Sequence, residues 1–265
     1  MRRLLTFPCA DQMLSGSLDE AGGPVGVLMV MGGSQTRIGS HRMYERLAKT
    51  LVDKGYPCLR FDRRGVGDSS GEDPGYRNSG LDLAAAAACL RSEAPAVERL
   101  VGFGLCDGAT ALALHGVDAG VSDLILVNPW LVEASSGEPA PAAIRSHYRQ
   151  RLLSLSGWKK LLTGKVNVRK LASGVRTAGS ATDTSLAEEA ARGLQRFGSP
   201  ATLILATGDG TAAAAAAEVE RPAFTGLIDA VIEIATDSHT FARAGDQEAL
   251  ESAVLAALTG LEREP

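Results

Sequence analysis

Short apolar runs recur along the chain and alternate with segments of helical pattern, and this alternation is what most constrains the fold. Residues 25–31 are VGVLMVM, residues 123–128 are DLILVN and residues 201–206 are ATLILA. Runs that are apolar at nearly every position are typical of strands buried on both faces of a parallel sheet. Because parallel neighbours need crossover connections, we predict an α/β fold with a mostly parallel, doubly wound sheet and right-handed crossovers.

The other elements follow from the same patterns. Ser40 is expected to cap the first helix, and Gly55 to end it. Further strands are predicted at residues 4–7, 12–18, 57–62, 99–105 and 230–235. Helices are predicted at residues 41–54, 79–92, 107–116, 212–220 and 246–261.

Composition excludes several classes of protein. A hydrophobic content of 45% and a charged content of 22% are ordinary for a soluble globular chain of 265 residues. A formal net charge of −4 argues against general nucleic-acid binding. No apolar run is long enough to span a bilayer, and Pro8 with the polar residues after it interrupts the apolar region that a signal peptide needs. A cytoplasmic location is therefore expected.

The four cysteines are expected to be free thiols of a reducing compartment. They show neither C-x-x-C nor any other metal-ligand spacing. No metal and no cofactor is predicted. The cysteines are Cys9, Cys58, Cys89 and Cys106.

A change of composition marks an insertion. Residues 133–141 are rich in Ser, Gly, Pro and Glu, and residues 142–176 carry nine basic side chains and no acidic one. We predict a core of residues 1–134 and 197–265 and a helical, basic cap at residues 135–196. The cap is either a solvated helix face, a docking surface for an acidic carrier protein, coenzyme A or acidic glycan, or a surface that lies on a membrane.

The pentapeptide G-L-C-D-G at residues 104–108 follows a predicted strand and begins a predicted helix. It has the G-x-S-x-G pattern of a nucleophile elbow, with sulfur in place of the serine oxygen. Cys106 is thus the candidate nucleophile, because a thiol is already partly ionised at neutral pH. The alternatives are a buried structural cysteine, and a redox-sensing thiol, which would need a second cysteine nearby.

The loop D-R-R-G-V-G-D-S at residues 62–69, the elbow and the late Ser238-His239 pair together resemble the α/β-hydrolase superfamily. Residues 32–42 (GGSQTRIGSHR), the loop after residue 61 and residues 102–109 are also similar to the exosortase A system-associated hydrolases of type 1. This resemblance implies an α/β-hydrolase fold with a helical cap insertion. It also suggests a link to the export of polysaccharides or surface proteins.

The order nucleophile, acid, histidine along an α/β-hydrolase chain points to Asp209 and His239. His239 follows the last predicted strand and is the candidate base. Asp209 would hold its imidazole in the right tautomer and stabilise the imidazolium; otherwise it is an ordinary turn aspartate. Asp237 lies two residues from His239 and is expected to diverge from its ring.

Backbone amides are expected to bind the oxyanion of an acyl-transfer reaction. One is the amide of Asp107, and the other belongs to Gly33 or Ser34, after the strand that ends near residue 31. Asp62, Arg64 and Asp68 are expected to hold their own loop together. The candidate substrate-binding residues are Gln35, Arg37, His41 and Trp130.

The predicted reaction is acyl transfer from a small-molecule or carrier-bound ester or thioester through a covalent acyl-enzyme on Cys106. The acyl group then passes to water, as in an esterase or thioesterase. An acyltransferase, which passes it to an amine, alcohol or thiol, is the alternative. A non-catalytic binding protein on the same fold is an alternative of another class.

Overall fold

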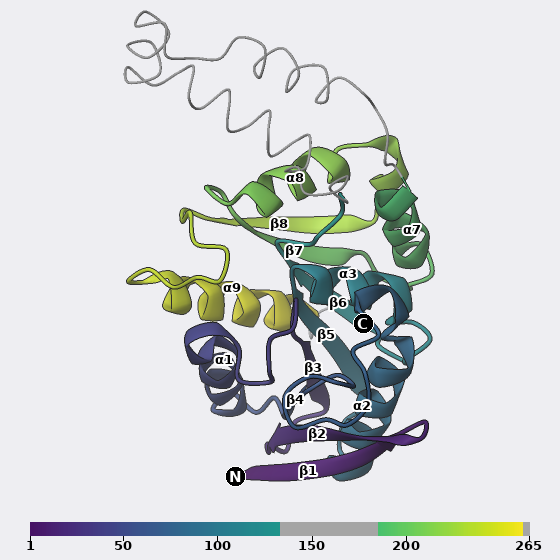
Figure 1. The fold of residues 1–265 in the computed structure, drawn as a ribbon. Coiled ribbons are helices and arrows are strands. Elements are labelled where there is room, and N and C mark those ends of the chain that lie inside the picture. The colour runs from purple at the N-terminus through teal and green to yellow at the C-terminus, as the bar shows by residue number, and fades with distance from the viewer. Residues whose placement is uncertain (133–184, 262–265) are drawn as a thin grey trace, which may run out of the picture.

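An eight-stranded sheet forms the centre of the computed structural model, which describes residues 1–132 and 185–261 (Figure 1). The strand order is β1-β2-β4-β3-β5-β6-β7-β8. β1 pairs antiparallel with β2 and β2 with β4, whereas every other neighbouring pair is parallel. The predicted α/β-hydrolase fold with a mostly parallel sheet is confirmed. The strands are β1 (Arg2–Cys9), β2 (Gln12–Asp19), β3 (Val25–Val30), β4 (Cys58–Phe61), β5 (Arg99–Leu105), β6 (Asp123–Val127), β7 (Ala201–Ala206) and β8 (Ile228–Ile234).

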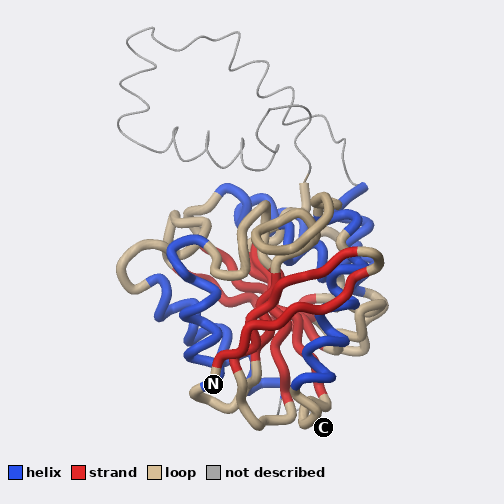
Figure 2. The backbone as a smooth tube through the Cα atoms, turned by 60° about the horizontal axis from the view of Figure 1, so that its bottom comes forward, coloured by secondary structure: helices blue, strands red, loops and turns tan. Residues whose placement is uncertain are grey.

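Helices cover both faces of the sheet (Figures 1 and 2). α1 (Met43–Val52) and α9 (Asp246–Leu261) pack on one face. The other face carries α2 (Gly80–Glu93), α3 (Asp107–His115), α7 (Ser185–Leu194) and α8 (Gly210–Val219). This double cover is the physical reason for strands that are apolar at every position.

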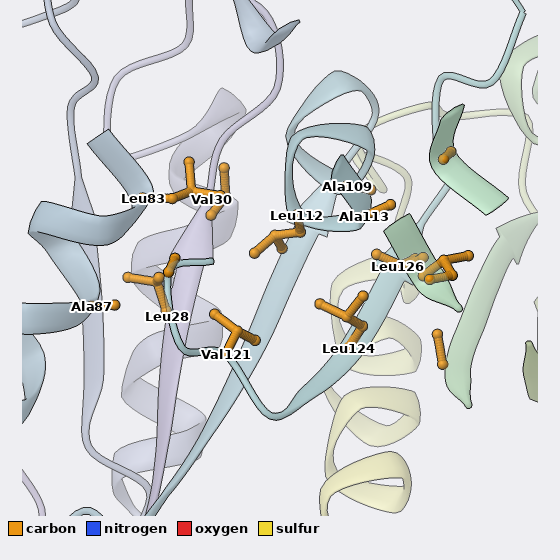
Figure 3. Packing of buried hydrophobic residues seen from close by; sticks show 14 of the residues in the cluster. Leu28, Val30, Leu83, Ala87, Ala109, Leu112, Ala113, Val121, Leu124 and Leu126 are labelled. Carbon is orange, nitrogen blue, oxygen red and sulfur yellow. The ribbon is translucent and has the colours of Figure 1, made fainter. Parts of the chain in front are cut away.

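β3 shows how one strand serves two cores. Leu28 and Val30 face the core with α2 and α3, where Leu83 and Leu112 pack (Figure 3). Val27 and Met29 face the core with α1 and α9. All six residues of the strand are buried, as alternating side chains in a sheet covered on both faces must be.

The first helix begins differently from the prediction. Ser40 does not cap it: residues Ser40–Arg42 form a 3-10 turn, and α1 starts at Met43 with Arg42 at its N-cap in the left-handed region. The Ser40 amide donates to Oε1 of Gln35, so this segment is held by the preceding loop. Gly55, with φ 97°, ends the helix as expected.

The N-terminal residues form β1 and pair with β2 along their whole length.

Among the helices of the described ranges, none is long and apolar enough to cross a membrane. Most of the predicted cap, its residues 135–184, lies outside the described residues, so the proposed division into core and cap stays a prediction.

The end of the predicted insertion is α7, which packs on α3, the helix that follows Cys106. Gly193 permits this contact, because a Cβ there would overlap the carbonyl oxygen of Ala113 in α3. Among the residues that the structure describes, none lies within 4 Å of a Cβ built on Gly260 in α9.

Gly193→Ala is expected to lower the free energy of unfolding by about 2–3 kcal/mol, because α7 must move away from α3. The matched control, Gly260→Ala, should raise it by about 0.5 kcal/mol through lower chain entropy. Urea denaturation followed by circular dichroism measures both. Equal effects of the two substitutions would contradict the close packing of α7 on α3.

Candidate active site

The candidate site residues lie where parallel strands end, which is the usual position of a site in an open α/β sheet. Gly33 follows β3, Cys106 follows β5 and Asn128 follows β6. Asp209 and His239 follow β7 and β8. The loops that the sequence singled out therefore belong to one edge of the sheet.

Cys106 stands on a sharp turn between β5 and α3. Its φ of 58° and ψ of −126° are unusual for a residue with a side chain. The turn is tight: a Cβ at Gly104 would lie 2.7 Å from the Ala109 nitrogen, and one at Gly108 would lie 2.5 Å from the Val30 oxygen. The two glycines of the pentapeptide are thus required by close backbone contacts, and the strained turn leaves Cys106 half-buried at the strand end.

The backbone of Cys106 is held firmly. Its amide donates to the Val127 carbonyl over 2.9 Å. Its carbonyl accepts the amides of Ala109, Thr110 and Trp130 over 3.1–3.2 Å. The Thr110 hydroxyl donates to the Trp130 carbonyl over 2.6 Å. The half-buried Trp130 is therefore fixed next to the elbow by its backbone.

His239 connects the elbow with Asp209. Its Nδ1 lies 3.0 Å from Oδ2 of Asp209. The pKa of His239 is raised to about 10. The hydrogen bond to Asp209 is the larger cause, and the hydrogen bond to the Cys106 side chain is the second. Because Nδ1 faces Asp209, we assign Nε2 to Cys106.

Asp209 has two hydrogen-bonding roles. It is the N-cap of α8, where Oδ2 accepts the Ala212 amide over 2.9 Å. Burial would raise the pKa of Asp209, but the hydrogen bonds from His239 and the Ala212 amide outweigh it and lower that pKa. Asp237, by contrast, is paired with Arg243 over 2.7 Å, so its carboxylate is engaged away from His239.

Asn128 positions the histidine loop, and the sequence analysis did not include it. Its side chain is fully buried, its Nδ2 donates to the His239 carbonyl over 3.2 Å and its Oδ1 accepts the Ala206 amide over 2.9 Å. Its φ of 41° lies in the left-handed region. The available signal was a polar residue between an apolar strand and Pro129.

The amides expected to bind an oxyanion differ in availability. In the part of the chain that the structure describes, the Asp107 and Ser34 amides have no hydrogen-bond acceptor. The Gly33 amide, however, donates to Oδ1 of Asp107 over 2.5 Å. A neighbouring carboxylate therefore occupies the Gly33 amide in this structure, and an oxyanion donor at Gly33 or Ser34 stays a prediction.

Three of the four candidate substrate-binding side chains have partners within the protein. Arg37 binds the carboxylates of Asp62 and Asp68. Oε1 of Gln35 accepts the Ser40 amide, and Nε2 of His41 lies 2.7 Å from the Thr240 carbonyl. These contacts give them a role in shaping the loops around the site. Trp130 stays a candidate for lining it.

The loop that contains residues 62–69 is held by charged contacts, as predicted. The carboxylate of the fully buried Asp62 accepts the amides of Arg37 and Asp68. Arg64 pairs with the buried Asp82 over 2.8 Å.

The other cysteines lack the environment of Cys106. Burial raises the pKa of the Cys58 thiol, and it raises that of Cys89 to about 11. All four described cysteines are free thiols. Within residues 1–132 and 185–261, no cluster of three or more His, Cys, Asp or Glu side chains could hold a metal ion.

The order of strands in the sheet, the elbow at Cys106 and the hydrogen-bonded pair of His239 and Asp209 are together typical of the α/β-hydrolase class. The sequence matches the alpha/beta hydrolase family over residues 27–254, and the chain belongs to that family. No curated protein sequence matches it.

Solved structures with the same fold share little sequence with the chain. An esterase of Pyrococcus furiosus superposes with a TM-score of 0.67 at 17% identity, over 98% of this chain and 90% of its own. Est1E of Butyrivibrio proteoclasticus, with bound ferulic acid, gives 0.65 at 14% identity over 97% and 98% of the chains. A dienelactone hydrolase of Anabaena variabilis gives 0.62 at 15% identity over 97% and 94%.

Asp209→Asn tests the charge of the histidine–aspartate pair, because asparagine still caps α8. The pKa of His239 is raised from 6.5 to about 10, so the stabilisation it brings is complete below pH 6.5 and is lost as the pH rises through 10. The melting temperature of the wild type should exceed that of the variant at pH 6, and the difference should shrink by pH 10. A difference that is constant across this range, measured by circular dichroism, would contradict the pairing.

Proposed function

We propose that the protein is a cysteine-dependent α/β hydrolase that cleaves an ester or thioester through an acyl-enzyme on Cys106. The observation that carries this proposal is the placement of His239 between Asp209 and Cys106 on a glycine-flanked elbow. A non-catalytic binding protein would not need a strained cysteine hydrogen-bonded to a histidine whose other nitrogen faces a carboxylate.

The raised pKa of His239 indicates how the reaction begins. At neutral pH the imidazole holds its proton. In the proposed reaction, the attacking form of Cys106 is the thiolate, the nucleophilic form of a cysteine. The thiolate sulfur forms a bond to the substrate carbonyl carbon, and the carbonyl electron pair moves to oxygen. Amides at the start of α3 and in the Gly33–Ser34 turn are the proposed donors to this oxyanion.

Collapse of the tetrahedral intermediate breaks the bond to the leaving group. The leaving alkoxide or thiolate takes the Nε2 proton of His239, and a thioester on Cys106 remains. His239 is now neutral and removes a proton from water, whose oxygen attacks the thioester. Collapse of this second intermediate breaks the bond between carbon and the Cys106 sulfur. The carboxylic acid is released, and the thiolate and the imidazolium are restored.

The substrate is proposed as a small-molecule or carrier-bound acyl compound. Esterases among the solved structures of this fold support the class of reaction. Delivery to an acidic carrier through basic residues 142–176, a cytoplasmic location and a link to polysaccharide or surface-protein export are further proposals, which rest on sequence alone. An acyltransferase would differ only in the acceptor that attacks the thioester.

Cys106→Ala is expected to abolish turnover of p-nitrophenyl esters and labelling of the site by iodoacetamide. Cys106→Ser keeps the shape of the site but needs His239 to accept a hydroxyl proton. Because Asp209 favours the protonated imidazole, this variant should be slower by at least about 100-fold. Unchanged turnover in Cys106→Ala would rule the nucleophile out.

The acyl donor is open to direct measurement. Intact-protein mass spectrometry after incubation with a panel of esters and thioesters should show a single acyl adduct, absent from Cys106→Ala. Loss of the adduct in water alone indicates a hydrolase. Persistence until an amine, alcohol or thiol is added indicates an acyltransferase, and no adduct with any donor would favour a binding protein.

A further inference from the structure

Both polar backbone groups of Gly33 are bound by charged side chains. Its amide donates to Oδ1 of Asp107 over 2.5 Å, and its carbonyl accepts Nη2 of Arg63 over 2.5 Å. The residue has a φ of 59°, and a Cβ there would meet no described atom within 4 Å. The two polar backbone groups of this residue are thus each bound by a charged side chain.

The Asp107 oxygen lies close to the nucleophile. A Cβ built on Gly32 would be 3.0 Å from Oδ1 of Asp107 and also 3.0 Å from Cβ of Cys106. A negatively charged oxygen that accepts the Gly33 amide beside Cys106 has the charge and the donor that a tetrahedral oxyanion would have. The carboxylate is thus an internal substitute for the oxyanion.

Arg63 has an unused hydrogen-bonding group beside this contact. Only 6% of its side chain is exposed, and its sole carboxylate partner in the described residues is Asp73, at a long 3.6 Å from Nη2. Its Nη1 is buried and, across the described ranges, has no hydrogen-bond acceptor. A buried guanidinium nitrogen without an acceptor costs free energy, so an additional acceptor would be favourable here.

We propose that Asp107 and Arg63 are positioning residues that control the oxyanion hole. In the resting site the Asp107 carboxylate occupies the Gly33 amide. When the oxyanion forms, it replaces that carboxylate, which turns to Nη1 of Arg63. This inference rests on the proposed function of Cys106, since it concerns the same acyl-transfer step.

The exchange balances hydrogen bonds and charge. The Gly33 amide keeps an anionic acceptor throughout, first the carboxylate and then the oxyanion. The carboxylate exchanges an amide for a guanidinium, and Nη1 gains the acceptor that it lacks. The carboxylate and the guanidinium bind the two polar backbone groups of one residue, so both side chains lie at the same turn.

Two reagents distinguish an effect on the oxyanion hole from an effect on the Cys106 thiolate. Acylation of Cys106 by a p-nitrophenyl ester passes through an oxyanion, whereas alkylation by iodoacetamide does not. The ratio of the two second-order rate constants therefore reports the availability of the oxyanion donors. It also cancels a change in the fraction of ionised sulfur, because the same thiolate attacks in both reactions.

Asp107→Ala is expected to raise this ratio by about 10- to 100-fold, because the Gly33 amide no longer has an anionic occupant. Asp107→Asn keeps the size but not the charge, and it should give an intermediate ratio. If the ratio falls in both variants, Asp107 instead supports the turn, and the proposal is overturned.

Arg63→Met removes the second partner and is expected to lower the ratio by about 3- to 10-fold, with recovery in Arg63→Lys. The substitution should have no effect in the Asp107→Ala background, where no carboxylate has to move. An equal loss in both backgrounds would show that Arg63 acts on the Gly33 carbonyl alone and would contradict the exchange.

The wild type separates failure of this inference from failure of the proposed function. If the ester leaves no acyl group on Cys106 in wild type or in either Asp107 variant, the proposed function fails. If wild-type Cys106 is acylated and the ratio does not rise in Asp107→Ala, only the positioning role is overturned.

Discussion

A close backbone contact in the site, where α3 begins against the end of β3, is the constraint on which the rest depends. Gly108 lies so near the Val30 carbonyl that no side chain fits between them, and Gly104 meets the Ala109 amide in the same way. These contacts force Cys106 into its strained conformation and turn the start of α3 toward the strand ends. Three amides then converge on the Cys106 carbonyl, so the strain is balanced by ordinary hydrogen bonds and the sulfur is held in one place.

The polar and charged groups around the Cys106 sulfur come from the ends of several strands. Asp209 caps a helix and also binds His239, so the same carboxylate fixes the loop after β7 and favours a protonated ring. Asn128, which follows β6, binds the Ala206 amide at the end of β7 and the His239 carbonyl in the loop after β8. Cys106 and His239 are thus held in place by neutral and charged contacts from residues at the ends of strands and helices.

The sequence predicted the elements well where a single segment determines its own structure. The limits of β7 and α9 match the prediction, because apolar periodicity and nearby turns define them. Contacts between distant parts of the loops are what the sequence did not show. Ser40 does not cap α1, which starts at Met43 after a 3-10 turn, and its amide is bound by Gln35. Arg37 is engaged by Asp62 and Asp68, and the Gly33 amide is occupied by Asp107. Pattern alone does not determine such pairings, since each depends on the side-chain geometry of the folded chain.

One feature of the core concerns the chain between Val132 and α7. The chain leaves the described core after Val132, just beyond a Trp130 tied to Cys106 and Thr110, and it returns in α7, which packs on α3. Both attachment points are therefore fixed to the helix that follows the nucleophile. For a flexible loop, the entropy of closure grows only slowly with length, so two ends anchored on one helix set a fixed cost that depends little on what joins them. The described residues that carry Cys106, Asp209 and His239 thus hold both of these ends themselves.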